Sequence, residues 1–222
     1  AAEAKPVEAG LIGGKFKPLT DKQMERINEA ALKVLEEVGI ADPTQELLDI
    51  ALPKGCFLNA EGRLCYPRAL IEDIVSKAAR EYIIYSRSPE FKDIEVGGNR
   101  IHYSTSGEAV SVLDIKTRKY RPSTIVDLYD FCRLTDRLEH LHQFGQTVVP
   151  TEIVNLYDHD INVAYAQICA TQKPMEHTFQ SVDNIDAVIE MYDMVAGGEG
   201  KFAKRPFASF GGCPIVSPLR FA

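Results

Sequence analysis

The stretch Met175-Glu176-His177-Thr178-Phe179-Gln180 decides the fold class, because of the signals that follow it. The stretch is β-prone, and Asp183 just beyond it is a suitable helix N-cap. Gly197 supplies a helix stop, and residues 206–213 are β-prone again. Between the two helix signals, apolar residues recur at helical spacing: Ile185, Val188, Ile189, Tyr192 and Val195. A strand, a helix and a strand within about 30 residues predict a β-α-β unit with parallel strands and a right-handed crossover.

The same unit recurs upstream. Ser123 or Thr124 begins a helix, a strand is expected over residues 144–149, and a second helix follows. These helices carry Leu128, Phe131, Leu134 and Leu138, and then Leu156, Ile161, Ala164, Tyr165 and Ile168. The glycine-rich loop of a dinucleotide-binding site directly follows a strand. The glycine cluster at residues 197–200 follows a helix instead, so it is better explained as the end of that helix. A (β/α)8 barrel is therefore preferred to a doubly wound sheet.

A helical preamble is predicted for residues 1–81. Its first part, residues 1–19, is a small and polar lead-in marked by Gly and Pro. Helices are then expected to begin at Thr20, at Asp42-Pro43 and at Pro67. Gln23 follows Thr20 at the capping-box spacing, and Gly39 supplies the stop of that first helix.

A small antiparallel β elaboration is predicted for residues 82–121. Within it, residues 94–96 and 100–103 are expected to form a hairpin around Gly97-Gly98. The fold class is thus α/β: the first units of a TIM (β/α)8 barrel over residues 122–222, preceded by the helical preamble and this elaboration.

The chain is too short for a complete barrel. A barrel needs about 250 residues, whereas these 222 show only three units. Ser217-Pro218 resembles the cap and first residue of a further helix. We therefore expect the chain to be the N-terminal half of a barrel protein.

The composition excludes several classes of protein. With 25 Lys and Arg against 32 Asp and Glu, the net charge is −7, which argues against a partner that is nucleic acid or a membrane surface. No apolar run approaches the roughly 20 residues of a membrane helix. The 5 cysteines are scattered without a C-x-x-C pair, which indicates reduced thiols and a cytoplasmic location.

Candidate binding residues are sought at the carboxyl ends of the strands, where β/α proteins place their sites. His177 is suited to bind a carboxylate or to act as an acid or base, and a hydrogen-bonded core histidine is the alternative. Four aromatic residues lie on or beside predicted strands, and they suit either a cage for a quaternary ammonium group or core packing: Tyr103, Phe144, Phe179 and Phe210.

Other polar positions carry weaker signals. Residues 103–108 form a polar loop that either reaches over the barrel mouth or is a plain turn. Cys213 lies at the end of a predicted strand without a motif that supports a nucleophile. No spacing of His and carboxylate residues requires a metal site, so none is predicted.

Several stretches, in this order and spacing, match a known family. They are residues 14–20, 27–39, 86–87, 121–124, 134–138, 148–150, 173–174 and 213–220. On these residues the chain resembles the trimethylamine:corrinoid methyltransferase family, including members that lack pyrrolysine and act on quaternary amines such as glycine betaine.

The resemblance implies a TIM barrel roughly twice as long as this chain, and a homo-oligomer. It implies transfer of a methyl group from a methylated amine to the cobalt of a corrinoid held by a separate protein, with no cofactor attached covalently to this chain. A positively charged nitrogen is a good leaving group, so the protein would hold the cation, exclude water and present the methyl group.

The resemblance also implies binding roles for individual residues. The aromatic residues named above would cage the cation, and His177, Gln180 or Arg220 would bind a substrate carboxylate. The catalytic residue stays unassigned, because the pyrrolysine of the trimethylamine branch lies in the second half of the barrel. The alternatives are a non-catalytic barrel that binds quaternary amines and an unrelated barrel enzyme with His177 as acid or base.

Overall fold

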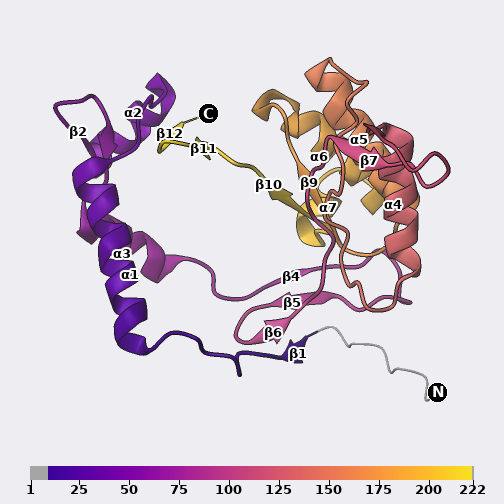
Figure 1. Cartoon of the computed structure of the whole chain (residues 1–222), viewed down its shortest axis with the longest axis horizontal. Coiled ribbons are helices and arrows are strands. Elements are labelled where there is room, and N and C mark those ends of the chain that lie inside the picture. Colours follow the sequence, from indigo (N-terminus) through magenta and orange to yellow (C-terminus); the bar gives the residue numbers. More distant parts are fainter. Residues whose placement is uncertain (1–9, 222) are drawn as a thin grey trace. The chain divides into compact units, whose positions relative to one another are not determined.

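The computed structural model describes residues 10–221, so residues 1–9 of the predicted lead-in lie outside it. The chain divides into two units, whose elements are labelled in Figure 1. The small unit comprises residues 14–79 and 213–221, and the large unit comprises residues 10–13 and 80–212. Each unit therefore combines segments that are far apart in the sequence.

The small unit contains the three helices predicted for this part of the chain: α1 (Asp21–Lys33), α2 (Gln45–Ala51) and α3 (Arg68–Lys77). Thr20 caps α1 as predicted, because its hydroxyl accepts the N–H of Gln23 while the Gln23 side chain accepts the N–H of Thr20. A wider turn over Val34–Val38 extends α1, and Gly39 ends it with a φ of 69°. A Cβ on Gly39 would lie 2.6 Å from the carbonyl oxygen of Leu64, so this position requires glycine.

Two hairpins complete the small unit. β2 (Phe57–Leu58) pairs with β3 (Leu64–Cys65), and β11 (Ile215–Val216) pairs with β12 (Arg220–Phe221), both antiparallel. The second hairpin corrects the prediction that Ser217-Pro218 begins a helix. The carbonyl of Leu219 in its turn accepts the N–H of Ala41 at 2.9 Å and the Arg63 guanidinium at 2.8 Å, so contacts distant in sequence hold this turn.

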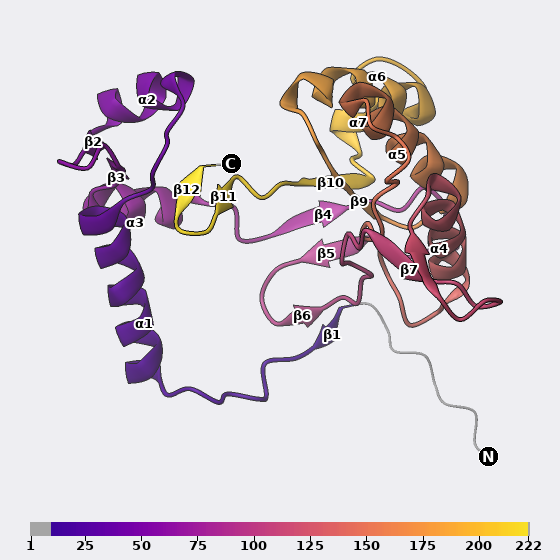
Figure 2. The same ribbon diagram turned by 45° about the horizontal axis from the view of Figure 1, so that its top comes forward.

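The antiparallel pairs of the large unit differ from the predicted hairpin. β5 (Ile94–Val96) pairs with β4 (Tyr82–Ile84), as Figure 2 shows, and β6 (Arg100–Ile101) pairs with β1 (Leu11–Ile12). The glycine turn does reverse the chain, with the N–H of Arg100 donating to the carbonyl of Gly97. The strands on either side nevertheless pair elsewhere, because Ile94 lies opposite Ile84 and both side chains become buried.

A third antiparallel pair joins β7 (Ser111–Leu113) to β8 (Tyr120–Pro122). The carboxylate of Asp114 shapes the turn between them, since it accepts the N–H groups of Lys116 and Thr117 at 3.0 and 2.8 Å. Ser123 and Thr124 were the two predicted start residues of the next helix, and Thr124 is the one that caps it, with a capping box.

Four extended segments of the large unit run parallel to one another. β9 (Met175–Thr178) pairs with β10 (Ala208–Gly211) in parallel, and Phe144 bridges Met175 in the same sense. Two further parallel bridges join residues 104–109 to residues 143–148. The connecting helices are α4 (Ile125–Arg137), α5 (Leu156–Ala170) and α6 (Ile185–Ala196). These are the parts with which a (β/α)8 barrel would open, and the barrel itself stays a prediction.

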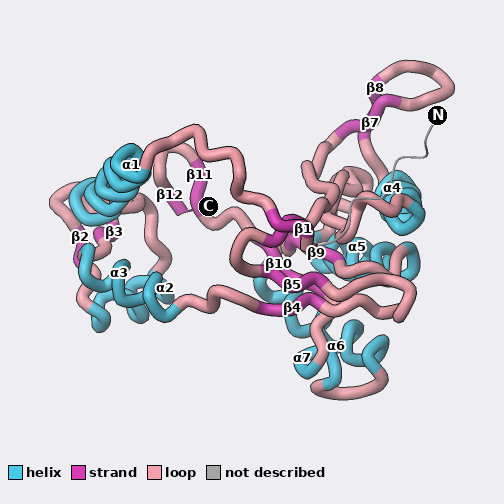
Figure 3. Tube along the Cα trace, turned by 90° about the horizontal axis from the view of Figure 1, so that it is seen from below, coloured by secondary structure: helices cyan, strands magenta, loops and turns pink. Residues whose placement is uncertain are grey.

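The strand predicted over residues 144–149 is reduced to isolated bridges, and Figure 3 shows how short the strands are beside the loops. Thr105 explains the interruption. Its hydroxyl accepts the N–H of Gly145 at 3.1 Å and donates to the carbonyl of the same residue at 2.7 Å. A side chain thus takes both backbone groups that a continuous ladder would use.

The main core lies between the parallel segments and the helices that connect them. The helices contribute apolar side chains from one face each, and α7 (Lys201–Lys204) adds an aromatic ring. The buried members include Leu128, Cys132, Phe144, Val148, Val163, Ala164, Met175, Val188, Tyr192, Phe202, Phe207 and Ala208. One face of the parallel segments is therefore covered by helices.

Candidate functional site

Side chains alternate between the two faces of the parallel segments. Met175 on β9 and Ala208 on β10 pair in register and belong to the core beneath the helices. Glu176 and Ser209, the next pair in register, therefore point to the opposite face. We call this opposite surface the polar face; its residues are Gln143, Gly145, Thr147, Glu176, Thr178, Ser209 and Gly211.

Two contacts confirm that these residues share one face. The side-chain amide of Gln143 donates to the hydroxyl of Ser209 at 3.4 Å across β9. A Cβ built on Gly211 would lie 2.9 Å from Oε1 of Glu176 and 3.8 Å from Oγ1 of Thr178. The missing side chain at Gly211 thus leaves the space into which the Glu176 carboxylate extends, toward the carboxyl end of the strands.

Glu176 is the only ionisable residue among these seven. It is partly buried, and none of the ion pairs among the described residues involves its carboxylate. Its neighbours Gln143, Thr178 and Ser209 add uncharged hydrogen-bonding groups. A lone carboxylate in a partly desolvated setting attracts a cation, and its hydroxyl and amide neighbours would orient a small polar ligand.

The structure brings three of the predicted binding residues together on the helix-covered face. The ring of His177 lies 4.5 Å from the ring of Phe179 and 6.5 Å from that of Phe210, and the two phenyl rings are 5.1 Å apart. Phe210 also contacts Tyr192 of α6. His177 is fully buried, whereas Phe210 keeps 41% of its surface exposed. The cluster therefore combines core packing with one accessible ring at the carboxyl end of β10.

His177 is held in an environment that disfavours its charged form. Burial lowers its pKa to about 4, His159 acts in the same direction, and Asp160 opposes them. Neither ring nitrogen has a hydrogen-bond partner among the described residues. The imidazole is therefore neutral at pH 7. An acid or base needs a group with which to exchange its proton, and neither ring nitrogen contacts one among the described residues.

This burial predicts an acid-sensitive contribution to stability. The unfolded chain takes up a proton on His177 near pH 6.5, whereas the folded chain resists protonation until about pH 4. The free energy of unfolding should thus fall as the pH drops from about 6.5 to about 4, by about 3 kcal/mol from this residue. Denaturant unfolding of the H177F variant at pH 7 and pH 4.5 should show a weaker pH dependence than wild type. An unchanged slope in H177F would contradict the prediction.

The other predicted residues are placed separately. Phe144 is fully buried in the core, and Tyr103 is 45% exposed with its ring 5.9 Å from that of His142. The backbone N–H of Gln180 donates to the carboxylate of Asp160, while the residue itself is exposed. Arg220 belongs to the small unit, where it pairs with Asp42 at 2.9 Å. Their proposed roles in binding stay predictions.

Sequence analysis did not single out the polar face, because its candidates on β9 and β10 were His177 and Phe210. His177 and Phe210 pair in register, so both lie on the face opposite Glu176. Along β9, Met175 and His177 are buried and alternate with the partly buried Glu176 and Thr178. This alternation in the sequence was the signal that the strand has two different faces. Residues 103–108 were likewise interpreted as a loop, although residues 104–109 form the first of the parallel segments.

Asp160 organises the chain just beyond β9. It is completely buried on α5, and its carboxylate accepts N–H groups from Gln180, Ser181 and the Asn184 side chain, the last at 2.7 Å. The His159 ring lies 3.2 Å from the same carboxylate. Asp160 thus fixes the turn that leads from the carboxyl end of β9 into α6.

Two wider searches complete the description. Within residues 10–221, no group of three or more His, Cys, Asp or Glu residues is arranged to hold a metal ion. In the same part of the chain, no helix is both long and apolar enough to span a membrane.

Parallel segments with connecting helices on one face and a polar face on the other define a β/α protein. The chain belongs to the trimethylamine methyltransferase (MTTB) family, whose model matches residues 5–222. This match confirms the resemblance found in the sequence.

Curated relatives agree with the family. The chain is 29% identical over 221 residues to trimethylamine methyltransferase MttB of Desulfitobacterium hafniense (strain DSM 10664 / DCB-2), which covers 96% of this chain and 43% of that protein. It is 24% identical over 199 residues to the glycine betaine methyltransferase of Desulfitobacterium hafniense (strain Y51), covering 89% and 40%. It is 24% identical over 216 residues to MttB of Methanosarcina barkeri, covering 96% and 43%. The chain thus spans less than half the length of these relatives.

Proposed function

We propose that the complete protein is a methyltransferase that moves a methyl group from a methylated amine, trimethylamine or a quaternary amine such as glycine betaine, to the cobalt of a corrinoid carried by a partner protein. The observation that carries the proposal is the family match over residues 5–222 together with relatives named for these two substrates. The polar face supports it, because its one carboxylate is of the sign that an ammonium substrate needs.

The transfer is a displacement at carbon. A reduced corrinoid on the partner protein would supply the electron pair of the new bond to the methyl carbon, and the pair of the broken C–N bond would stay on nitrogen. The amine therefore leaves with one methyl group fewer, and a substrate nitrogen that starts with a positive charge leaves neutral. The protein is required only to bind the cation, orient one methyl group and exclude water.

The residues of the large unit suit those tasks. Glu176 would hold the cation by electrostatic attraction, and Thr178 and Ser209 lie beside it on the same face. Gly211 leaves room for the carboxylate, since a Cβ there would crowd Oε1 of Glu176 at 2.9 Å.

The fold belongs to the same proposal. We infer that residues 104–211 open a TIM barrel, with the polar face lining its interior. The support is the parallel pairing of β9 with β10, the bridge of Phe144 to Met175, and helices on the outer face. In such a barrel the carboxyl ends of the strands form the mouth, to which the Glu176 carboxylate extends.

The direct test is methyl transfer by the full-length protein. Trimethylamine, glycine betaine, carnitine and proline betaine are each incubated with the protein and cob(I)alamin, with and without a corrinoid protein, and methylcobalamin is followed by its absorbance. We expect methylcobalamin with at least one of the four amines. If none yields it when a corrinoid protein is supplied, the proposed activity is wrong. Calorimetric binding of an amine without transfer would instead favour a non-catalytic amine-binding protein.

A further inference from the structure

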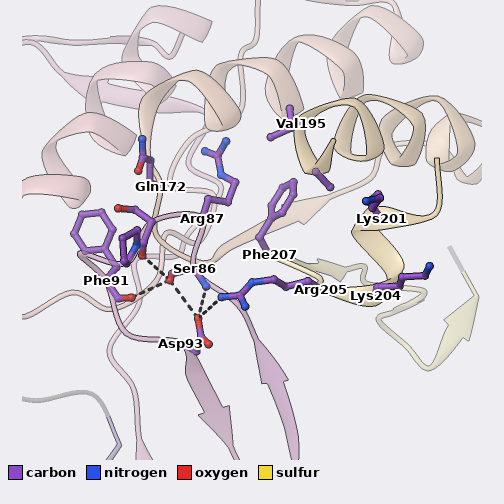
Figure 4. A pocket seen from close by; sticks show the side chains of 13 residues that line it. Ser86, Arg87, Phe91, Asp93, Gln172, Val195, Lys201, Lys204, Arg205 and Phe207 are labelled. Carbon is purple, nitrogen blue, oxygen red and sulfur yellow. Dashed lines mark hydrogen bonds and ion pairs between the residues drawn. The ribbon is translucent and has the colours of Figure 1, made fainter. Parts of the chain in front are cut away.

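A cavity lies at the amino ends of the parallel strands β9 and β10. Its volume is about 790 Å3, and Figure 4 shows the side chains that line it. Its walls come from the loop after β4, from Gln172 before β9, from the end of α6 and from α7. The polar face points its carboxylate toward the carboxyl ends, so this cavity is separate from the proposed methyl-transfer site.

The cavity is strongly positive, although the chain as a whole carries a net charge of −7. Four cationic side chains line it, and Asp93 is the single carboxylate: Arg87, Lys201, Lys204 and Arg205 are the cations. Arg205 lies 3.6 Å from Asp93 and stacks on the Tyr85 ring at 4.5 Å. Lys201 and Lys204 lie on one side of α7, and neither has an ion-pair partner among the described residues. The lining thus has an excess of three positive charges.

Arg87 is fixed in the wall of this cavity by contacts within the protein. Its Nη2 donates to the carbonyls of Ile168 and Thr171 at the end of α5, and its guanidinium lies 5.3 Å from the centre of the Phe207 ring. Its Nε is buried and has no hydrogen-bond partner among the described residues. Arg87 thus contributes a fixed positive charge to the wall of the cavity.

The wall that carries Arg87 is preorganised. The N–H of Ser86 donates to Asp93 at 2.8 Å, and its hydroxyl oxygen lies 2.9 Å from the carbonyl oxygen of Ser88 and 2.8 Å from that of Phe91. These bonds close the loop on itself, as the dashed lines in Figure 4 show. A wall that is already fixed costs little conformational entropy when a ligand binds.

We propose that this cavity binds a small organic polyphosphate of the nucleoside di- or triphosphate class. Arg87, Lys201, Lys204 and Arg205 provide the charge for several phosphate oxygens, and Arg presents the forked donors that phosphates prefer. Phe91, Val195 and Phe207 offer an apolar surface for the remainder of the molecule. The volume matches that of ordinary small-ligand sites, whereas a macromolecular partner would need a broad surface.

Calorimetric titration of the full-length protein tests the proposal, with ATP, tripolyphosphate and adenosine as probes at 0.15 M salt. We expect ATP to bind most tightly, tripolyphosphate more weakly and adenosine not measurably. The K201Q/K204Q variant should weaken ATP binding at least tenfold, because two phosphate-binding charges are lost. Methyl transfer by this variant should match wild type, because the two lysines lie outside the proposed methyl-transfer site.

The matched control is K116Q/K119Q, which removes two exposed lysines with the same spacing from the turn between β7 and β8. It should bind ATP like wild type. Absence of ATP and tripolyphosphate binding by wild type, or equal binding by K201Q/K204Q, would overturn the proposal. Equal affinities of wild type for ATP and tripolyphosphate would refute the claim that the organic part of the ligand contributes to binding.

Discussion

Replacing Glu176 with Gln is expected to lower kcat/KM for the methylated amine about 30- to 100-fold in the full-length protein. The substitution keeps the shape of the side chain but removes the only charge of the polar face. Losing one charge partner of a bound cation in a partly desolvated site costs about 2–3 kcal/mol. Initial rates of methylcobalamin formation across amine concentrations measure the effect, and circular dichroism verifies the fold.

Two further variants sharpen this test. E190Q removes an exposed carboxylate from α6 and should leave kcat/KM unchanged. G211A adds a Cβ that would lie 2.9 Å from Oε1 of Glu176, so it should displace the carboxylate and produce a smaller loss than E176Q. Wild-type kcat/KM in E176Q would show that Glu176 does not hold the substrate, even if the protein is a methyltransferase.

The D160A substitution is expected to lower the free energy of unfolding by about 3–5 kcal/mol. The carboxylate is completely buried and accepts N–H groups from Gln180, Ser181 and Asn184. Its removal leaves these donors without their acceptor, and a buried unpaired donor costs more than the hydrogen bond contributed. Urea unfolding at pH 7, followed by circular dichroism, measures the loss.

Control variants separate this effect from a general loss of charge on α5. D158A removes an exposed acidic residue from the first turn of the same helix and should cost about 0.5 kcal/mol. D160N retains one acceptor oxygen and should fall between D158A and D160A. A loss below about 1 kcal/mol in D160A would contradict the assigned role of this carboxylate.

The helices were predictable from local signals. Thr20 with Gln23, and Thr124 with Asp127, form the capping boxes that begin α1 and α4. Gly197 ends α6 in the left-handed conformation, as a glycine stop requires. These contacts join residues within one helical turn, so the sequence around them contains all the atoms involved.

The β structure was predicted less well, because its partners are distant. The hairpin expected around Gly97-Gly98 gives way to pairing of β5 with β4, which buries Ile94 against Ile84. The strand expected over residues 144–149 is interrupted by the Thr105 hydroxyl, which is 40 residues from Gly145 in sequence. No local pattern reveals either contact.

The candidate site also depends on contacts that the sequence does not reveal, because neighbouring residues of one strand face opposite sides. Sequence analysis selected His177 and Phe210 on β9 and β10, and the structure shows that they pair in register and face the helices. Glu176 lies one position away on the opposite face. Strand periodicity separates residues into two sets, and only the packing of helices against one set shows which set remains open.

The sequence by itself determined the helices with their caps, the β-α-β order and the family, because these depend on short-range signals and on the order of residues. Tertiary structure alone decided which strands pair, which face of the parallel segments the helices cover, and that four cations gather at the amino ends of β9 and β10. The physical reason is that burial and charge act between side chains that are near in space, whatever their separation in the chain.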